Sequence, residues 1–345
     1  MENQGYLRWL ASETPTVWWH DSADPSEVDV GLEHAARGVT TNPVLTQRAL
    51  VAHVARWREA LGPGVAGLSP TERAEAITRV VVRDTANKLQ AEHAASGGAQ
   101  GYVCAQVDPT RAGDRETMLA MARRYQAWAP NIAVKLPVTA AGLDILEECV
   151  AEGITITATV SFTVPQVLAV AERHRAGAAR ARQAGIEPGH CFAVIMIGRL
   201  DDYIRDVAWD GKAQVSEADV RQAGLAVSKR AYRIYQERGY EAVLLVAALR
   251  GTYHMTELAG AELVMSIHPR HQAMLLEPDV PQEMRFDLPI APATIDRLRQ
   301  VPEFVRSYEP DGMSPAEFIT YGATQRTLSQ FIQVGWAMLE AFSGF

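Results

Sequence analysis

Short apolar runs alternate with longer amphipathic segments along most of this chain. That alternation is typical of repeated strand–helix units around a parallel sheet. Eight apolar runs occur, at residues 16–19, 38–41, 102–107, 132–138, 155–161, 192–197, 242–249 and 263–267. Eight parallel strands close a β/α barrel, so the pattern predicts the α/β class: an eight-stranded parallel β/α (TIM) barrel with additional N- and C-terminal helices.

The segments between the runs predict the helices. Helical periodicity covers residues 71–95, 115–128, 141–152 and 164–184, then one long helix at 217–238 and one or two closing helices within 314–342. Residues 269–313 contain seven of the 18 prolines, which indicates a loop-rich stretch with one short helix near 292–299. No linker divides the chain, so we expect residues 1–345 to form a single barrel domain.

The side chains on alternate sides of each predicted strand face either the barrel interior or the helix layer. In the fifth run, one face is wholly hydroxylated and consists of Thr155, Thr157, Thr159 and Ser161. The other face is apolar. This alternation predicts a polar barrel interior.

Lys135 shares the inward face of the fourth run with Ala133 and Pro137. Burial depresses the pKa of a lysine, and the resulting neutral amine can attack a ketone to form an imine. The alternative is that Lys135 is one partner of a buried ion pair. The sequence therefore offers Lys135 as a candidate catalytic amine.

Composition narrows the function. The formal net charge is −8 and the pI is near 5.6, which disfavours binding to nucleic acid or to anionic membranes. No stretch approaches eighteen consecutive apolar residues, and the first nine residues lack a basic segment followed by an apolar run, so we expect a cytoplasmic protein. Cys104, Cys149 and Cys191 show no paired or metal-type spacing and are expected to be buried thiols.

Several segments, in order and spacing along nearly the whole chain, resemble the transaldolase family of Schiff-base aldolases. The most specific are Thr40-Thr41-Asn42-Pro43 and Val134-Lys135-Leu136-Pro137. Further matches are Trp19-His20-Asp21-Ser22, Gln106-Val107-Asp108-Pro109, Glu152-Gly153-Ile154, Gly198-Arg199-Leu200-Asp201-Asp202 and Ala247-Ala248-Leu249-Arg250.

The resemblance implies a role for each matching residue. Lys135 corresponds to the Schiff-base lysine, and Asp21 to the carboxylate that handles a substrate hydroxyl proton during C–C cleavage. Asn42 corresponds to an asparagine that hydrogen-bonds substrate hydroxyls, and Thr159 to a threonine that positions a catalytic water. From the residues alone, Asp21 reads as a helix cap, Asn42 as part of a turn and Thr159 as an ordinary strand residue.

Arg199 and Arg250 correspond to the family's cationic positions for a sugar phosphate, and the guanidinium fork suits that dianion. Either could instead be a solvated surface arginine. Asp108, Asp201 and Asp202 are read as loop and ion-pair residues. His254 and His268 follow strands seven and eight, where either could reach the barrel mouth, although a lone histidine is more often structural.

The chain departs from the family at several pocket positions. Gln106 stands where most transaldolases have a glutamate that acts as acid and base, and fructose-6-phosphate aldolases carry glutamine there. Thr157 replaces an asparagine and Met196 an aromatic residue among the substrate-binding positions. Val194 and Ala248 each replace a serine, and the serine at the second position helps to bind phosphate. These replacements imply a less polar pocket.

Three functions follow from the sequence. The first is a transaldolase-like enzyme that transfers a dihydroxyacetone unit between sugars or sugar phosphates. The second, which Gln106 favours, is an aldolase that makes or cleaves a C–C bond with free dihydroxyacetone. The third is a non-catalytic barrel that binds a sugar phosphate. Imine chemistry needs neither metal nor cofactor, so we expect none, and by resemblance we expect a homo-oligomer.

Overall fold

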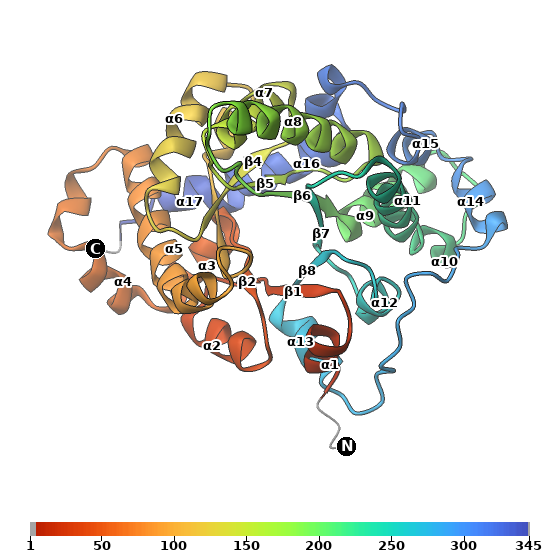
Figure 1. The fold of residues 1–345 in the computed structure, drawn as a ribbon, viewed down its shortest axis with the longest axis horizontal. Helices are drawn as coiled ribbons and strands as arrows, with labels where there is room; N and C mark the ends of the chain where they lie inside the picture. Colours follow the sequence, from red (N-terminus) through yellow and green to blue (C-terminus); the bar gives the residue numbers. More distant parts are fainter. Residues whose placement is uncertain (1–4, 344–345) are drawn as a thin grey trace.

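The computed structural model describes residues 5–343 of the 345-residue chain (Figure 1). Eight parallel strands form a closed barrel in sequence order, which confirms the predicted fold. The strands are β1 (Val17–His20), β2 (Gly38–Val39), β3 (Tyr102–Gln106), β4 (Ile132–Pro137), β5 (Ile156–Thr159), β6 (Cys191–Met196), β7 (Val243–Ala247) and β8 (Val264–Ile267). Each begins and ends within two residues of its predicted run.

Helices surround this barrel, as Figure 1 shows. Those before β6 are α1 (Tyr6–Glu13), α2 (Pro25–Glu33), α3 (Pro43–Ala52), α4 (Val54–Leu61), α5 (Pro70–Ala95), α6 (Arg115–Gln126), α7 (Ala140–Ala151) and α8 (Val164–Gln183). Those after it are α9 (Ile197–Asp210), α10 (Glu217–Val220), α11 (Ala223–Arg238), α12 (Thr252–Thr256), α13 (Pro269–Leu275), α14 (Pro292–Leu298) and α15 (Pro302–Tyr308). Short 3₁₀ turns are η1 (Pro63–Gly67) and η2 (Pro109–Arg111).

Aromatic side chains fill the barrel near the amino-terminal ends of the strands. The Phe192 ring contacts Trp19 and Tyr102, with centroid distances of 4.6 and 5.6 Å. Gly38 leaves room for this packing, because a Cβ there would lie 2.6 Å from the Trp19 ring. These rings occupy the barrel interior away from the carboxyl ends of the strands, where a cavity opens.

The C-terminal segment crosses that open end. It consists of the 3₁₀ turn η3 (Pro315–Thr320), α16 (Gly322–Gln330), the π-helical segment η4 (Phe331–Trp336) and α17 (Ala337–Glu340). The segment contacts α9 at one side of the barrel and α3 and α5 at the other. Gly335 packs directly on Pro43, where a Cβ would lie 2.7 Å from the proline Cβ. This close approach holds η4 against the start of α3.

The prediction of one long helix over residues 217–238 is wrong, because the helix is interrupted between α10 and α11. The buried Asp201 carboxylate of α9 accepts a hydrogen bond from Gly224 N in the first turn of α11, at 2.8 Å. A Cβ on Gly224 would lie 2.6 Å from Ile197 O, so α11 begins where it meets α9. A tertiary contact therefore starts this helix, and periodicity does not reveal that contact.

Residues 269–313 hold more helix than predicted. The short helix near 292–299 is confirmed as α14, but α13 and α15 flank it. All three begin with proline at a first helical position, namely Pro269, Pro292 and Pro302. Proline suits that position because its missing N–H would have no intrahelical partner. Pro269 and Pro302 therefore begin helices in a stretch where their composition predicts loops.

The three cysteines are buried and free, as predicted. Within residues 5–343, no helix has the length and apolarity that a membrane crossing requires.

Candidate active site

A cavity of about 360 Å³ opens at the carboxyl ends of the strands. Its wall includes side chains that face inward by strand alternation and others from the helices that follow the strands. Residues that line the cavity include Asp21, Thr40, Asn42, Arg48, Lys135, Thr159, Met196, Arg199, Arg250, Ser266, His268, Arg270, His271 and Phe331. Seven of the nine candidate site residues from the sequence are among them.

Lys135 lies at the floor of this cavity with only 6% of its surface exposed. Its Nζ donates a hydrogen bond to Thr41 O at 3.0 Å. Burial lowers the pKa of the amine; Asp21 opposes that shift and Arg199 adds to it. No carboxylate in the described chain forms an ion pair with Lys135, so the structure argues against the ion-pair alternative and for an amine biased towards its neutral form.

Asp21 follows β1 and is held by hydroxyl groups from the two neighbouring strands. Thr40 Oγ1 donates to Asp21 Oδ1 at 2.7 Å and lies 2.6 Å from Ser266 Oγ. Because Thr40 gives its only proton to Asp21, Ser266 must be the donor in the second bond. The helix-cap alternative for Asp21 is wrong, since Asp24 caps α2.

Asn42 both caps helix α3 and lines the cavity. Its Oδ1 accepts hydrogen bonds from Val44 N and Leu45 N, so it caps α3. Asn42 also lines the cavity. The cap uses the oxygen of the amide, and Nδ2 remains as the donor for a ligand.

Three further predicted residues cluster around Lys135. Strand register pairs Lys135 with Gln106 on β3 and with Thr157 on β5. Neither of these lines the cavity: Thr157 is fully buried against Cys104 Sγ at 3.4 Å, and Gln106 is 4% exposed. Thr159 does line it, and among residues 5–343 its buried Oγ1 has no hydrogen-bond partner. A hydroxyl in that position can hold a water beside the amine.

Arg199 enters the cavity from the first turn of α9, next to Met196 at the end of β6. Its guanidinium lies over the Phe331 ring, 5.4 Å from the centroid. Burial, and then the neighbouring Arg250, lower its pKa to about 10. Its Nε is buried and has no partner in the part of the chain that the structure describes. Arg199 is therefore a cation whose donors are available to an anionic ligand.

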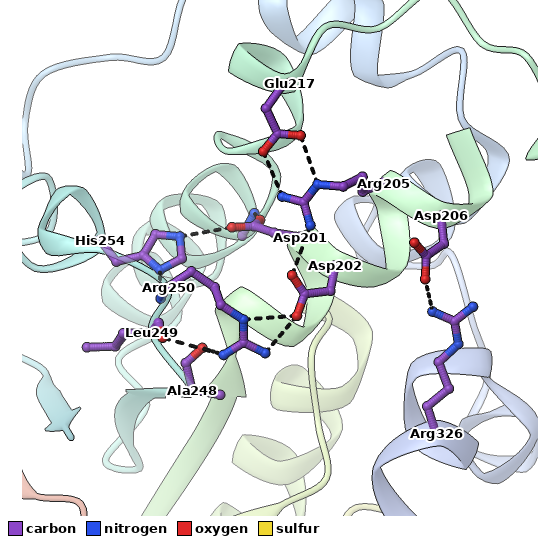
Figure 2. A network of polar contacts seen from close by, with 11 residues as sticks. Asp201, Asp202, Arg205, Asp206, Glu217, Ala248, Leu249, Arg250, His254 and Arg326 are labelled. Atoms are coloured by element: carbon purple, nitrogen blue, oxygen red, sulfur yellow. Dashed lines mark hydrogen bonds and ion pairs between the residues drawn. The ribbon is translucent and has the colours of Figure 1, made fainter. Parts of the chain in front are cut away.

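Arg250 also reaches the cavity, but it is already paired. Figure 2 shows its guanidinium donating from Nε and Nη2 to Asp202 Oδ2, at 2.9 and 2.7 Å. Asp202 accepts a further hydrogen bond from Arg205, which in turn pairs with Glu217. An anion that binds Arg250 must therefore share it with Asp202.

His254 holds the segment after β7 in place. Its Nε2 lies 2.9 Å from Asp201 Oδ2, and its Nδ1 accepts a hydrogen bond from Arg250 N at 3.2 Å. Both side chains of this pair are completely buried. Figure 2 shows the pair joining α9 to the Arg250 loop. His254 therefore has a structural position outside the cavity, whereas His268 lines it.

Sequence reasoning missed several side chains of the cavity. Thr40 and Ser266 have inward parity on their strands, so the alternation rule could have found them. Arg48, Arg270 and His271 lie on helices after β2 and β8, where no strand pattern reaches. Phe331 comes from the far C-terminal segment, and only the three-dimensional path of η4 brings it here. Among the described residues, no group of three or more His, Cys, Asp or Glu side chains is arranged to hold a metal ion.

The fold and this cavity together define a β/α-barrel protein with a buried lysine at the floor of a cavity that opens at the carboxyl ends of its strands. Residues 18–298 match the family model described as Transaldolase/Fructose-6-phosphate aldolase, and the chain belongs to that family.

Individual relatives agree with this assignment. The chain is 30% identical over 243 residues to "Transaldolase 1" of Streptomyces avermitilis, an alignment that covers 67% of this chain and 64% of the relative. It is 32% identical over 206 residues to "Transaldolase" of Mycolicibacterium paratuberculosis, covering 58% and 55%. A longer match, 25% identical over 334 residues, covers 93% of the chain and 87% of "Transaldolase" of Parafrankia sp.. For the first two, the chain spans less than two thirds of the relative's length.

Proposed function

We propose that this chain is a transaldolase-type enzyme that carries a dihydroxyacetone unit from a ketose phosphate to an aldehyde, as an imine on Lys135. One observation carries the proposal: a buried amine without a carboxylate partner among the described residues lies at the floor of a cavity that opens at the carboxyl ends of the strands. A pure binding protein has no use for so costly a group.

The reaction begins at Lys135 Nζ. The neutral amine attacks the C2 carbonyl of the ketose, and a water held by Thr159 moves the protons that let hydroxide leave as water. The protonated imine then draws electrons from the C3–C4 bond. Asp21 takes the proton of the C4 hydroxyl, the bond breaks, and the first aldehyde leaves. The remaining carbanion is delocalised into the imine and adds to the carbonyl of the second aldehyde, while Asp21 returns the proton. Water then hydrolyses the new imine, which releases the product ketose and regenerates the amine of Lys135.

The phosphate of the ketose is placed at Arg199. The unpartnered Nε and the ring of Phe331 beneath the guanidinium support this placement. Arg250 contributes at the same side of the mouth, although Asp202 already compensates part of its charge. Asn42 follows β2, across the barrel from β6, and its Nδ2 then donates hydrogen bonds to substrate hydroxyls.

The test is intact mass after borohydride reduction with fructose 6-phosphate, and separately with dihydroxyacetone. We expect an adduct in the wild type that Lys135→Met abolishes. Lys229→Met is the matched control, because Lys229 is another buried lysine but lies on α11 outside the cavity. No adduct from either compound, with fructose 6-phosphate still bound, would contradict the enzyme and favour a binding barrel.

Gln106 favours a second candidate within the same chemistry, an aldolase that releases or adds free dihydroxyacetone. Its amide cannot act as a general acid or base, and its buried Oε1 has no hydrogen-bond partner among the described residues. Product analysis with and without an acceptor aldehyde distinguishes the two. Free dihydroxyacetone formed from fructose 6-phosphate at the same rate in both assays would favour the aldolase.

A further inference from the structure

A second set of basic side chains lines the cavity apart from Arg199 and Arg250. It consists of Arg48, His268, Arg270 and His271, here called the β1-flanking group. Arg48 lies on α3 after β2, and the other three lie at the end of β8 and on α13. Strands β2 and β8 both pair with β1, whose end carries Asp21. The group therefore flanks Asp21, whereas Arg199 enters from β6.

The two arginines of this group lack the ion-pair partners that many arginines of the described chain have. Ion pairs such as Arg326 with Asp206 are frequent, as expected in a chain with 41 acidic and 33 basic residues (Figure 2). Within residues 5–343, the guanidinium groups of Arg48 and Arg270 form no hydrogen bond or ion pair, although both line the cavity. Unpaired like charges around one cavity repel one another, and a bound anion would relieve that repulsion.

His271 adds an unpartnered polar atom to the same wall. Its Nδ1 is buried, and no other described residue hydrogen-bonds to it. Buried polar atoms without a protein partner commonly mark a position that a ligand or water completes. Burial, followed by His268, Arg270, His254 and Arg250, lowers the pKa of His271. All four of these neighbours are basic side chains, so the surroundings favour a negatively charged ligand.

We propose that the β1-flanking group is a second anion subsite, which takes a phosphate or carboxylate group of the substrate in addition to the phosphate at Arg199. The substrates of such a site are a sugar and an aldehyde that together carry two anionic groups. One anionic group then lies at each side of the cavity mouth. This inference rests on the proposed function only for the identity of the substrate. The subsite itself needs only an oxyanion, which Arg48 and Arg270 bind through charge-assisted hydrogen bonds and His271 through its ring.

The first experiment measures the binding of inorganic phosphate to the full chain by titration calorimetry. We expect two sites, of which Arg48→Gln/Arg270→Gln removes one and Arg199→Gln the other, each with a loss of about tenfold or more in affinity. The matched control is Arg79→Gln/Arg83→Gln on α5, because these arginines are also unpaired in the described chain but line a different surface groove. A single site that only Arg199→Gln weakens would overturn the proposal.

The second experiment uses borohydride trapping and separates the two proposals. Arg48→Gln/Arg270→Gln should reduce about tenfold the preference for fructose 1,6-bisphosphate over fructose 6-phosphate as inhibitor of borohydride trapping with neutral dihydroxyacetone, when inhibition is measured relative to each variant's own uninhibited trapping. Malonate in place of phosphate distinguishes a carboxylate from a phosphate subsite. An unchanged preference contradicts the subsite, whereas an absent dihydroxyacetone adduct in the wild type contradicts the proposed enzyme and leaves the phosphate titration valid.

Discussion

Lys135 makes the protein's stability depend on pH. Burial lowers the pKa of its amine below the ordinary value of 10.5, so the buried ammonium costs stability below the folded-state pKa. That cost decreases as the pH rises through the folded-state pKa and vanishes only above 10.5, where the amine is neutral in both the folded and the unfolded state. Lys135→Met should therefore stabilise the protein at pH 7, by about 1–2 °C in Tm per kcal/mol relieved, and less at pH 10.

Thermal unfolding at the two pH values checks this prediction. Lys212→Met is the control, because Lys212 is an exposed lysine and its removal should cause no pH-dependent difference. An equal gain in Tm at both pH values would mean that methionine stabilises by packing alone.

Asp21 and Asp24 are near neighbours with different tasks. Asp21→Asn keeps an acceptor for Thr40 but loses the base for C–C cleavage, so we expect turnover to fall about 10²–10⁴-fold while imine formation continues. Borohydride trapping with fructose 6-phosphate should then yield the uncleaved six-carbon adduct instead of the three-carbon one. Asp24→Asn removes the charge of the α2 cap and should leave turnover unchanged. Equal products from wild type and Asp21→Asn would refute the assignment.

At single positions, strand alternation predicted most of the cavity. The inward positions of Lys135 and Thr159 follow from a two-residue period that a closed barrel enforces. The same rule cannot tell how deep a side chain lies, which is why Thr157 was expected in the cavity and is buried against Cys104. Arg48 and Arg270 escaped prediction because their helices follow a different period and face the mouth only through tertiary packing.

Among the helices, α9 organises the region around the proposed phosphate site. It supplies Arg199, the buried Asp201 that fixes His254 and α11, and Asp202 that holds Arg250. Asp201→Ala should destabilise the protein by about 3–5 kcal/mol, because it leaves His254 Nε2 and Gly224 N buried without a partner. Asp206→Ala on the same helix removes only an exposed ion pair and should cost about 0–1 kcal/mol. Urea unfolding of both variants tests the contrast, and similar losses would refute it.

Helix boundaries set by local chemistry were predictable, whereas those set by contacts were not. The helices 115–128 and 164–184 match α6 and α8 closely because their periodicity is long and their ends carry ordinary capping residues. The break before α11 depends on Asp201, twenty-two residues earlier in the chain than Ala223. The hydrophobic periodicity of the sequence does not indicate such a contact.

The whole molecule is acidic, yet its cavity is lined by arginines and histidines. A phosphorylated substrate is attracted to the cavity and repelled by much of the remaining surface, and salt screens both effects. We expect the KM for fructose 6-phosphate to rise about several-fold between 0.05 and 0.5 M NaCl, and half-saturation by dihydroxyacetone to stay constant. Steady-state assays and trapping titrations at the two salt concentrations test this, and parallel changes for both compounds would argue against a cationic mouth.

The family match ends at residue 298, whereas Phe331 belongs to the C-terminal segment beyond it. The proposed catalytic lysine and the ring that supports Arg199 therefore come from segments far apart in the chain, Lys135 from β4 and Phe331 from η4. Substitutions in η4 can reshape the mouth without altering any residue of the proposed proton transfers. Exchange of this segment between relatives offers a route to new substrate preferences on an unchanged barrel. Such a chimaera must keep the close contact between Gly335 and Pro43.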